Sequence, residues 1–211
     1  MRIAVIGVGM VGSALGPRFA DAGHEVVYGV RDPGADRHDE LLSATPGGTT
    51  AIIADAAAGS DAVLLAVPWE AIDSVVGQLG SASGLVWDAT NPLSQDMRHL
   101  REDAEPSGAA VVAARLPTAK VVKAFNCTGA PNLASPAYPA GPIAMFLAGD
   151  DPAAKTTTAA VCREIGMSPV DLGPLEMARS LEHLALCWIR LAYAQGMGPD
   201  FTIGIRHRAV G

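Results

Sequence analysis

The stretch that decides the fold is Arg2-Ile3-Ala4-Val5-Ile6-Gly7-Val8-Gly9-Met10-Val11-Gly12, close to the start of the chain. A short apolar run, typical of a buried strand, leads into glycines with the spacing GxGxxG. Apolar residues from Val11 to Ala22 then recur at helical spacing. In such a turn the first glycine permits a sharp bend, the second leaves the backbone open, and the third lets the helix pack closely on the strand. The stretch therefore predicts a strand, a glycine turn and a helix.

This arrangement is typical of dinucleotide binding, because the turn opens a helix whose first N–H groups point at a pyrophosphate. A purely structural turn would need one glycine, whereas three glycines each add a conformational entropy cost on folding. We therefore interpret the turn as a dinucleotide site. The residues expected at the pyrophosphate are Gly7, Val8, Gly9, Met10, Val11 and Gly12.

Six further apolar runs alternate with helix-like segments along the chain, which is typical of a parallel α/β sheet. Most of these runs are continuous rather than alternating, as expected for strands that helices cover on both faces. We predict a doubly wound parallel (Rossmann) sheet with a short C-terminal helical extension. The expected strands are residues 2–6, 25–30, 62–67, 85–88, 121–125, 143–148 and 168–171.

The last long helix is expected to begin after Pro174 and to end near Gln195, before Gly196-Met197-Gly198-Pro199. Its second half is apolar nearly all round, so it requires cover on several sides. We therefore expect two parts: a nucleotide-binding Rossmann domain, residues 1–173, and a helix and tail, residues 174–211. The second part is expected to complete the site of the second substrate and to contact the other copy in a homodimer.

Composition excludes several classes of partner. The 211-residue chain has a formal net charge of -7 and lacks the clustered Lys and Arg that nucleic acids require. Its longest apolar stretch, residues 184–194, is shorter than the ~20 residues of a membrane span, and we expect no leader, because Met1 and Arg2 run directly into the first strand. Cys127, Cys162 and Cys187 lack the spacing of a metal site or a disulfide framework. We expect a cytoplasmic protein that binds no nucleic acid, membrane or metal.

The residue that selects the dinucleotide follows the second expected strand. In such folds an acidic residue there binds the ribose of NAD, and an arginine accommodates the 2′-phosphate of NADP. Here the segment reads Val30-Arg31-Asp32, and the planar guanidinium of Arg31 suits phosphate oxygens. NADP is therefore the expected cofactor. The alternative is that Asp32 binds the ribose of NAD and Arg31 is a solvated surface residue.

Three segments that follow expected strands carry a resemblance: Val67-Pro68-Trp69-Glu70, Asp88-Ala89-Thr90-Asn91-Pro92 and Lys123-Ala124-Phe125-Asn126-Cys127. With the glycine turn, they make the chain resemble the NADPH-dependent F-420 reductase family, which is related to the cytoplasmic domain of the STEAP ferric reductases. The resemblance extends nearly end to end, through residues 148–151, 173–175 and 196–198. It implies an oxidoreductase that passes a hydride between NADP(H) and a flavin-like small-molecule acceptor.

By this resemblance the glycine turn binds the pyrophosphate, and Val30 and Arg31 bind the 2′-phosphate, although many members have serine at the position of Val30. The other residues implied to bind the cofactor are Val67, Pro68, Trp69, Asn91, Ala124, Phe125 and Asn126. Those implied to contact the second substrate are Asn126, Cys127, Gly196, Met197 and Gly198. No catalytic side chain is expected, because the cofactors carry the chemistry and the protein aligns them.

The acceptor stays open between coenzyme F-420 and a flavin. The archaeal deazaflavin reductases have a histidine at the position of Asn126, and the Ala-Phe-Asn form of this chain is closer to the ferric reductase domain. F-420 is therefore the leading acceptor, and the alternative is an NADPH-dependent flavin (FMN or FAD) or ferric reductase. A catalytically silent NADP-sensing module is a further alternative. Reduction of small imines or carbonyls is another, disfavoured because too few residues follow residue 171 to form a substrate domain.

Several side chains near the expected site have two interpretations. Cys127 is a nucleophile or a small packing residue, and His183 is a proton donor or a structural histidine. Lys120 and Lys123 attract an acidic coenzyme tail or are solvated charges, and Trp69 stacks on a ring or belongs to the core. For the cysteine, the histidine and the lysines we expect the second interpretation. For the tryptophan both stay open.

Overall fold

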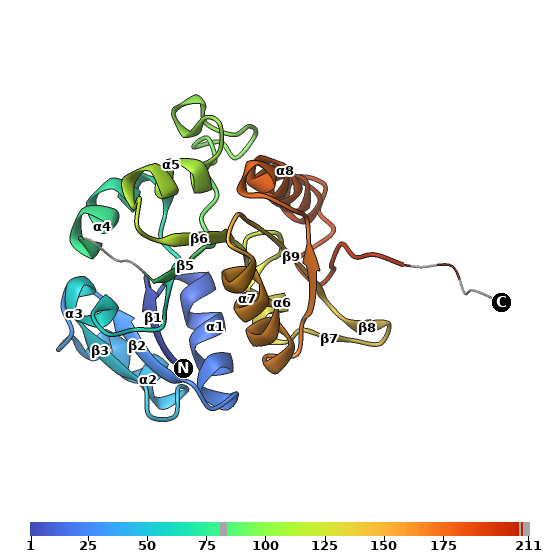
Figure 1. Ribbon diagram of the computed structural model, residues 1–211. Coiled ribbons are helices and arrows are strands. Elements are labelled where there is room, and N and C mark those ends of the chain that lie inside the picture. Colours follow the sequence, from blue (N-terminus) through green and yellow to red (C-terminus); the bar gives the residue numbers. More distant parts are fainter. Residues whose placement is uncertain (81–83, 207, 209–211) are drawn as a thin grey trace.

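The computed structural model describes residues 1–80, 84–206 and 208, and over these residues the strands form one large sheet and one small hairpin (Figure 1). The strand order in the large sheet is β10-β9-β6-β5-β4-β1-β2-β3. Its strands are β1 Arg2–Ile6, β2 Glu25–Gly29, β3 Thr49–Ala51, β4 Ala62–Leu65, β5 Leu85–Asp88, β6 Lys120–Lys123, β9 Ala144–Gly149 and β10 Ser168–Asp171. The hairpin pairs β7 Ala137–Tyr138 with β8 Gly141–Pro142.

Helices cover both faces of this sheet (Figure 1). One face carries α1 Met10–Asp21, α6 Ala130–Ala134 and α7 Pro152–Glu164. The other carries α3 Ile53–Ala57, α4 Ile72–Leu79, α5 Gly108–Arg115 and the start of α8 Ala178–Ile189. The shorter helical segments are η1 Asp36–His38, α2 Asp39–Ser43, η2 Trp69–Ala71, η3 Glu102–Ala104, η4 Leu175–Met177 and the π-helix η5 Arg190–Ala194.

The direction of winding reverses beside the first strand. Strand β1 pairs in parallel with β2 on one side and with β4 on the other. The chain reaches the sheet edge at β3 and then returns to the middle at β4. In such sheets ligands bind outside the carboxyl ends of the strands, where the order reverses. The predicted α/β fold class, a doubly wound sheet with a C-terminal helical region, is confirmed, and the sheet is mostly parallel.

Strand β9 departs from the expected all-parallel arrangement. It pairs antiparallel with β6, and β10 then pairs in parallel with β9. Between β6 and β9 the chain forms only the short helix α6 and the β7–β8 hairpin, and α6 packs against α1. The chain therefore re-enters the sheet from the edge at which β6 ends. A continuous apolar run has the same pattern in either direction, so the sequence does not reveal this reversal.

Two of the expected strands end two residues earlier than predicted, so residues near the expected site lie outside them. Strand β4 ends at Leu65 and β6 ends at Lys123. For β6 the cause lies in one residue, because Phe125 has a φ of 63°, outside the extended region. The segments 66–68 and 124–127 are therefore not strand but turns at the carboxyl edge. Strand β3, which has only three residues, is not among the expected strands.

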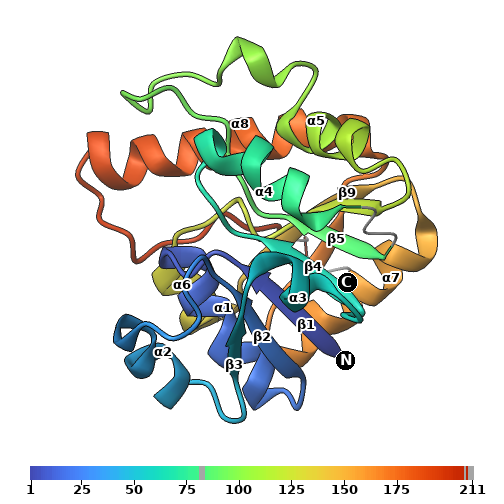
Figure 2. The ribbon, with the colours of Figure 1, turned by 90° about the vertical axis from the view of Figure 1, so that its left-hand side faces the viewer.

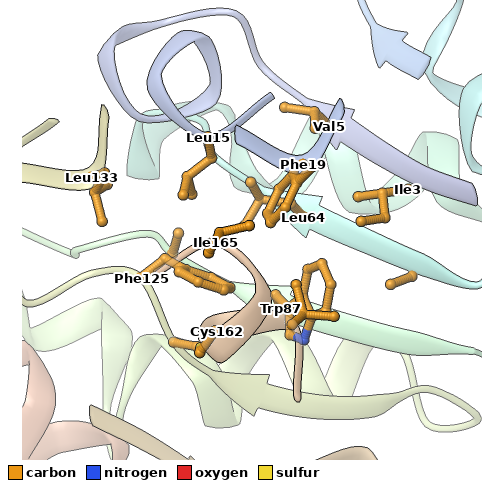
Figure 3. Close-up of a cluster of buried hydrophobic side chains, with 14 of the residues drawn as sticks. Ile3, Val5, Leu15, Phe19, Leu64, Trp87, Phe125, Leu133, Cys162 and Ile165 are labelled. Carbon is orange, nitrogen blue, oxygen red and sulfur yellow. The ribbon is translucent and has the colours of Figure 1, made fainter. Parts of the chain in front are cut away.

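The core on the α1 face contains an aromatic group formed by Phe19, Trp87 and Phe125 (Figure 3). Phe19 stacks on Trp87 with 5.7 Å between ring centroids, and Phe125 meets Trp87 edge to face at 5.6 Å. The Trp87 indole donates a hydrogen bond to the Thr158 hydroxyl at 2.8 Å, so its one polar group is satisfied although the ring is fully buried. This group joins β5, α1 and the turn after β6.

The last helix occupies the predicted span. It begins in η4 after Pro174, continues through α8 and ends with η5 at Ala194. The tail then folds back, because the Trp188 indole donates to the Phe201 carbonyl at 2.9 Å and the two rings stack. No described helix is long and apolar enough to cross a membrane. Of the expected second part, residues 207 and 209–211 lie outside the described residues, and the homodimer stays a prediction.

Candidate functional site

The three glycines of the turn differ in what surrounds them. Gly7 has a φ of 102°, and a Cβ there would lie 2.4 Å from the Ala66 carbonyl oxygen. A Cβ on Gly12 would lie 1.9 Å from the Gly7 carbonyl oxygen, so α1 could not pack on the turn. At Gly9, by contrast, a Cβ would meet no atom within 4 Å. Folding therefore requires glycine at positions 7 and 12. At Gly9 the space is free for a ligand.

A cleft of about 760 Å³ lies beside this turn, at the carboxyl ends of β1, β2 and β4. It extends between the turn and the helices α3 and α4, which Figure 2 shows beside the central strands. Among the residues expected to bind the cofactor, the cleft brings together Gly7, Val8, Gly9, Val30, Arg31, Val67 and Pro68. Its lining also includes residues that sequence reasoning missed, namely Arg37, His38, Ile53, Ala71, Ser74, Val75 and Gln78.

Two arginines reach the β2 end of the cleft. Arg31 and Arg37 both line it and are exposed, and neither forms an ion pair within the described part of the chain. The loop between them is anchored, because the buried His38 ring nitrogen donates to the Asp32 carbonyl at 3.1 Å. Asp32 itself is not part of the lining. Two unpaired guanidinium groups on an anchored loop suit a phosphate. Arg37 carries no sequence signal, since only the return of the loop through η1 brings it to the cleft.

The other expected cofactor residues do not line this cleft. Met10 is exposed at the start of α1, followed by the half-buried Val11 and the buried Gly12. Trp69 is 6% exposed and belongs to the core beneath α4 and α5, which favours the core interpretation of this residue. Among the residues expected to contact the second substrate, Gly196, Met197 and Gly198 follow the end of η5, where Met197 is exposed.

The turns after β5 and β6 are joined by a pair of asparagines. The Asn126 amide donates to Asn91 Oδ1 at 2.9 Å, and the Asn91 amide donates to the Asn126 carbonyl at 3.1 Å. The Asn126 amide also donates to the Leu181 carbonyl of α8, at 3.1 Å, and its Oδ1 accepts from the Cys127 thiol at 3.0 Å. Protein groups therefore use the whole side-chain amide of Asn126, which is buried. We call this arrangement the asparagine clasp.

Ala124 and Phe125 precede this clasp, and both side chains are fully buried. The Phe125 ring packs in the aromatic core, so only the backbone of these residues is free to contact a ligand. The backbone of Phe125 is strained, because a bulky residue rarely adopts a positive φ. Strain of this kind is concentrated at functional sites, where the surrounding structure maintains it.

The lysines and the histidine near the site all have partners within the protein. Lys120 pairs with Asp151 at 3.1 Å near the surface. Lys123, which we expected to be a solvated charge, is instead completely buried, because its ammonium group pairs with two buried carboxylates. His183 is exposed on α8 and donates from Nδ1 to the Arg179 carbonyl at 2.9 Å.

The Cys127 thiol is poorly suited to act as a nucleophile. Burial raises its pKa to about 12, and burial likewise raises the pKa of the Cys162 thiol to about 12. Because the thiolate is the reactive form, a raised pKa keeps both groups protonated and inert near neutral pH. These observations favour the packing interpretation of Cys127.

Thiol titration tests whether the buried Cys127 and Cys162 are unreactive and the exposed Cys187 is reactive. At pH 8, Ellman's reagent should react with one thiol per native chain, the exposed Cys187, and with all three after denaturation. The Cys187→Ser variant, as the control, should show no reactive thiol while native. Rapid labelling of Cys127 in that variant would contradict the assignment of a buried, protonated thiol.

The sheet reversal, the glycine turn and the adjoining cleft define a dinucleotide-binding protein of the Rossmann class. The sequence profile described as "NADP oxidoreductase coenzyme F420-dependent" matches residues 2–92. The solved structure of a candidate F420-dependent NADP reductase from Arthrobacter sp. FB24 is 31% identical, with a TM-score of 0.88 over 98% of this chain and 100% of that one. The chain therefore belongs to the coenzyme F-420-dependent NADP oxidoreductase family, and it is an NADP-dependent oxidoreductase.

Three further proteins are similar to this chain. The hypothetical protein SMa0349 from Sinorhizobium meliloti is 31% identical, with a TM-score of 0.75 over 83% of this chain and 86% of that one. Metalloreductase STEAP3 from Rattus norvegicus is 27% identical over 193 residues, or 88% of this chain. The chain spans only 36% of that curated relative. A reductive aminase from Aspergillus terreus, in complex with NADPH and ethyl levulinate, shares the fold, with 19% identity and a TM-score of 0.63 over 92% of this chain and 62% of that one.

Proposed function

We propose that this oxidoreductase transfers a hydride between NADP(H) and a flavin-like acceptor, with coenzyme F-420 as the leading candidate. The observation that supports NADP binding is the cleft itself, because Gly9, where a Cβ would meet no atom within 4 Å, lines the same cavity as Arg31 and Arg37. The F-420 half is supported by similarity over the full length of the Arthrobacter protein.

The residues present fit NADP. The open backbone at Gly9, at the N-terminus of α1, would hold the pyrophosphate, because no side chain caps this helix. Arg31 and Arg37 would hold the 2′-phosphate, and apolar residues such as Val67 and Val75 would line the adenosine. Bound NADPH supplies the hydride.

The protein's contribution on the acceptor side is alignment. The Asn126 amide and the Cys127 thiol are both engaged in protein hydrogen bonds, so neither is free to act as an acid or a base. Holding two rings in reacting geometry supplies several kcal/mol through orientation alone. The rigid turns after β5 and β6 suit such a role, because the asparagine clasp and the strained Phe125 leave them little freedom.

The second candidate is an NADPH-dependent flavin or ferric reductase. The similarity to rat STEAP3, a metalloreductase, favours the ferric form of this alternative, although this chain corresponds to about a third of that protein. The Ala124-Phe125-Asn126 segment, which resembles the ferric reductase domain, supports the same alternative.

An acceptor screen tests the proposed function. Protein and NADPH are mixed with F-420, FMN, FAD or ferric citrate, and the absorbance of NADPH and of each acceptor is followed. We expect turnover with F-420 to exceed turnover with every other acceptor. Faster turnover with FMN or FAD would transfer the assignment to a flavin reductase. Tight NADPH binding without turnover on any acceptor would contradict the enzymatic proposal and favour an NADP sensor.

A further inference from the structure

Lys123, the last residue of β6, is completely buried and bonded to three different segments. Its ammonium group donates to Asp88 Oδ2 at 2.9 Å and to the Thr90 carbonyl at 2.5 Å. It also lies 3.3 Å from Glu182 Oε1 on α8. One side chain therefore ties together the end of β5, the turn that follows β5, and the C-terminal helix.

Both carboxylates around Lys123 have further partners. Asp88 Oδ1 accepts from the Thr90 backbone N–H at 2.9 Å and from the Thr90 hydroxyl at 2.7 Å. Glu182 Oε1 accepts from the Gly108 N–H at 2.8 Å, at the start of α5, and Arg179 lies 3.3 Å from Glu182 Oε2. The network therefore contains charges of both signs, and each carboxylate oxygen has a partner.

Lys123 is charged in this environment. Burial works against the ammonium ion, but the Coulombic attraction of Asp88 and then of Glu182 outweighs it, so the pKa of Lys123 is raised above its usual value. A buried ionic network of this kind contributes little net stability over apolar side chains of similar volume, although breaking it is costly. Its distinctive effect is geometric, because it fixes the relative positions of the segments that it joins.

The asparagine clasp joins neighbouring parts of the fold a second time, namely the turn after β5, the turn after β6 and α8. Asn91 follows Thr90 in the turn after β5, Asn126 lies three residues beyond Lys123, and Leu181 precedes Glu182 in α8. Each segment is thus held by the clasp and by the Lys123 network at neighbouring residues. Figure 2 shows α8 and α5 side by side across the top of the molecule, and these two helices are in contact.

The position of the network in the sheet indicates which part of a dinucleotide it serves. The proposed 2′-phosphate site lies at the end of β2, and the proposed pyrophosphate site lies at the turn after β1. The sheet order continues from β1 to β4, β5 and β6. A dinucleotide that binds along the carboxyl edge therefore directs its nicotinamide half toward the turns after β5 and β6.

From this geometry we infer that Lys123 is a positioning residue, which holds the turn after β5 against α8 at the spacing that the nicotinamide half of NADPH requires. The role rests on the proposed NADP site. This role differs from that of the cleft residues, because Lys123 would affect only the binding of the nicotinamide half of NADPH. Loss of the network should weaken the binding of NADPH but not of 2′,5′-ADP, a fragment that contains the 2′-phosphate and lacks the nicotinamide.

The test uses the full chain with Glu182→Gln, which keeps the shape of the side chain and removes the charge opposite Lys123. By titration calorimetry we expect NADPH to bind about tenfold more weakly, the size of effect typical of a change that acts on a ligand through intervening residues, and 2′,5′-ADP to bind within about twofold of wild type. The matched control is Thr158→Val, which removes a buried hydrogen bond to Trp87 on the other face of the sheet. It should lower the melting temperature and leave both affinities unchanged.

A second variant covers the case in which Glu182→Gln fails to fold. Lys123→Met combined with Asp88→Asn removes one charge of each sign and leaves Glu182 paired with Arg179. The same selective loss of NADPH affinity is expected. Equal weakening of NADPH and 2′,5′-ADP in a folded variant would overturn the positioning role, as would no change in either. Wild-type protein that binds neither ligand would contradict the NADP site itself.

Discussion

Gly9→Val should lower the affinity for NADPH by about 100-fold or more. The valine side chain would prevent two charge-assisted hydrogen bonds from the backbone to the pyrophosphate, each worth about 1.5–3 kcal/mol. The melting temperature should stay close to that of wild type. Gly9 has a φ of -76° and a ψ of -165°, an extended conformation that valine adopts readily, and a Cβ there meets no protein atom within 4 Å. The added side chain would instead occupy the space that the proposed pyrophosphate needs.

Gly77 offers a matched control for this substitution. It lies on the exposed side of α4, outside the cleft lining, and a Cβ there also meets no atom within 4 Å. Gly77→Ala should leave NADPH affinity unchanged and raise stability by up to about 1 kcal/mol, the difference in helix propensity. A Gly9→Val protein that binds NADPH as wild type would show that the ligand does not approach the turn.

Removal of both cleft arginines should abolish the preference for NADPH over NADH. Each of Arg31→Ala and Arg37→Ala should weaken NADPH binding about tenfold, and the double variant about 100-fold, because each guanidinium contributes a charged hydrogen bond to the 2′-phosphate. Affinity for NADH, which lacks this phosphate, should change by less than about twofold, since no contact is lost. The measurement is the pair of dissociation constants for NADPH and NADH.

The control for the arginine variants is Arg163→Ala, an exposed arginine of α7 on the opposite face of the sheet. It tests whether a general loss of positive charge weakens the binding of an anionic ligand. We expect both affinities to stay as in wild type. If the double variant kept its NADPH preference, the 2′-phosphate would have to bind outside the β2 end of the cleft. An effect confined to Arg37 would instead favour the alternative in which Arg31 is only a surface residue.

The features that could be predicted from the sequence are those with local causes. The glycine turn is encoded in six consecutive residues, and the structure shows steric reasons for glycine at Gly7 and Gly12. Arg31 is placed at the cleft by its position directly after β2. The C-terminal helix follows from its apolar periodicity and from the glycines at 196 and 198, which both have positive φ.

The features that could not be predicted depend on contacts between distant segments. Lys123 has the sequence context of a surface residue, and its burial depends on Asp88 and on Glu182, which lies in the last helix. The resemblance implies that Asn126 contacts the ligands, and nothing in the sequence indicates that Asn91 and Leu181 accept hydrogen bonds from its side-chain amide. The positive φ of Phe125 leaves no trace in the residue type, although it sets the end of β6.

The proposed hydride transfer from NADPH to F-420 can be followed with an isotope label. NADPH that carries deuterium at C4 is prepared in two forms, one labelled on each face of the ring. Each form is mixed with the protein and F-420, and the reduced acceptor is analysed by mass spectrometry. A deazaflavin accepts the hydride on carbon, so the label is retained. We expect deuterium in reduced F-420 from one form and not from the other. Reduced F-420 that carries no deuterium from either form, or no reduction of F-420 at all, would contradict the proposed hydride transfer.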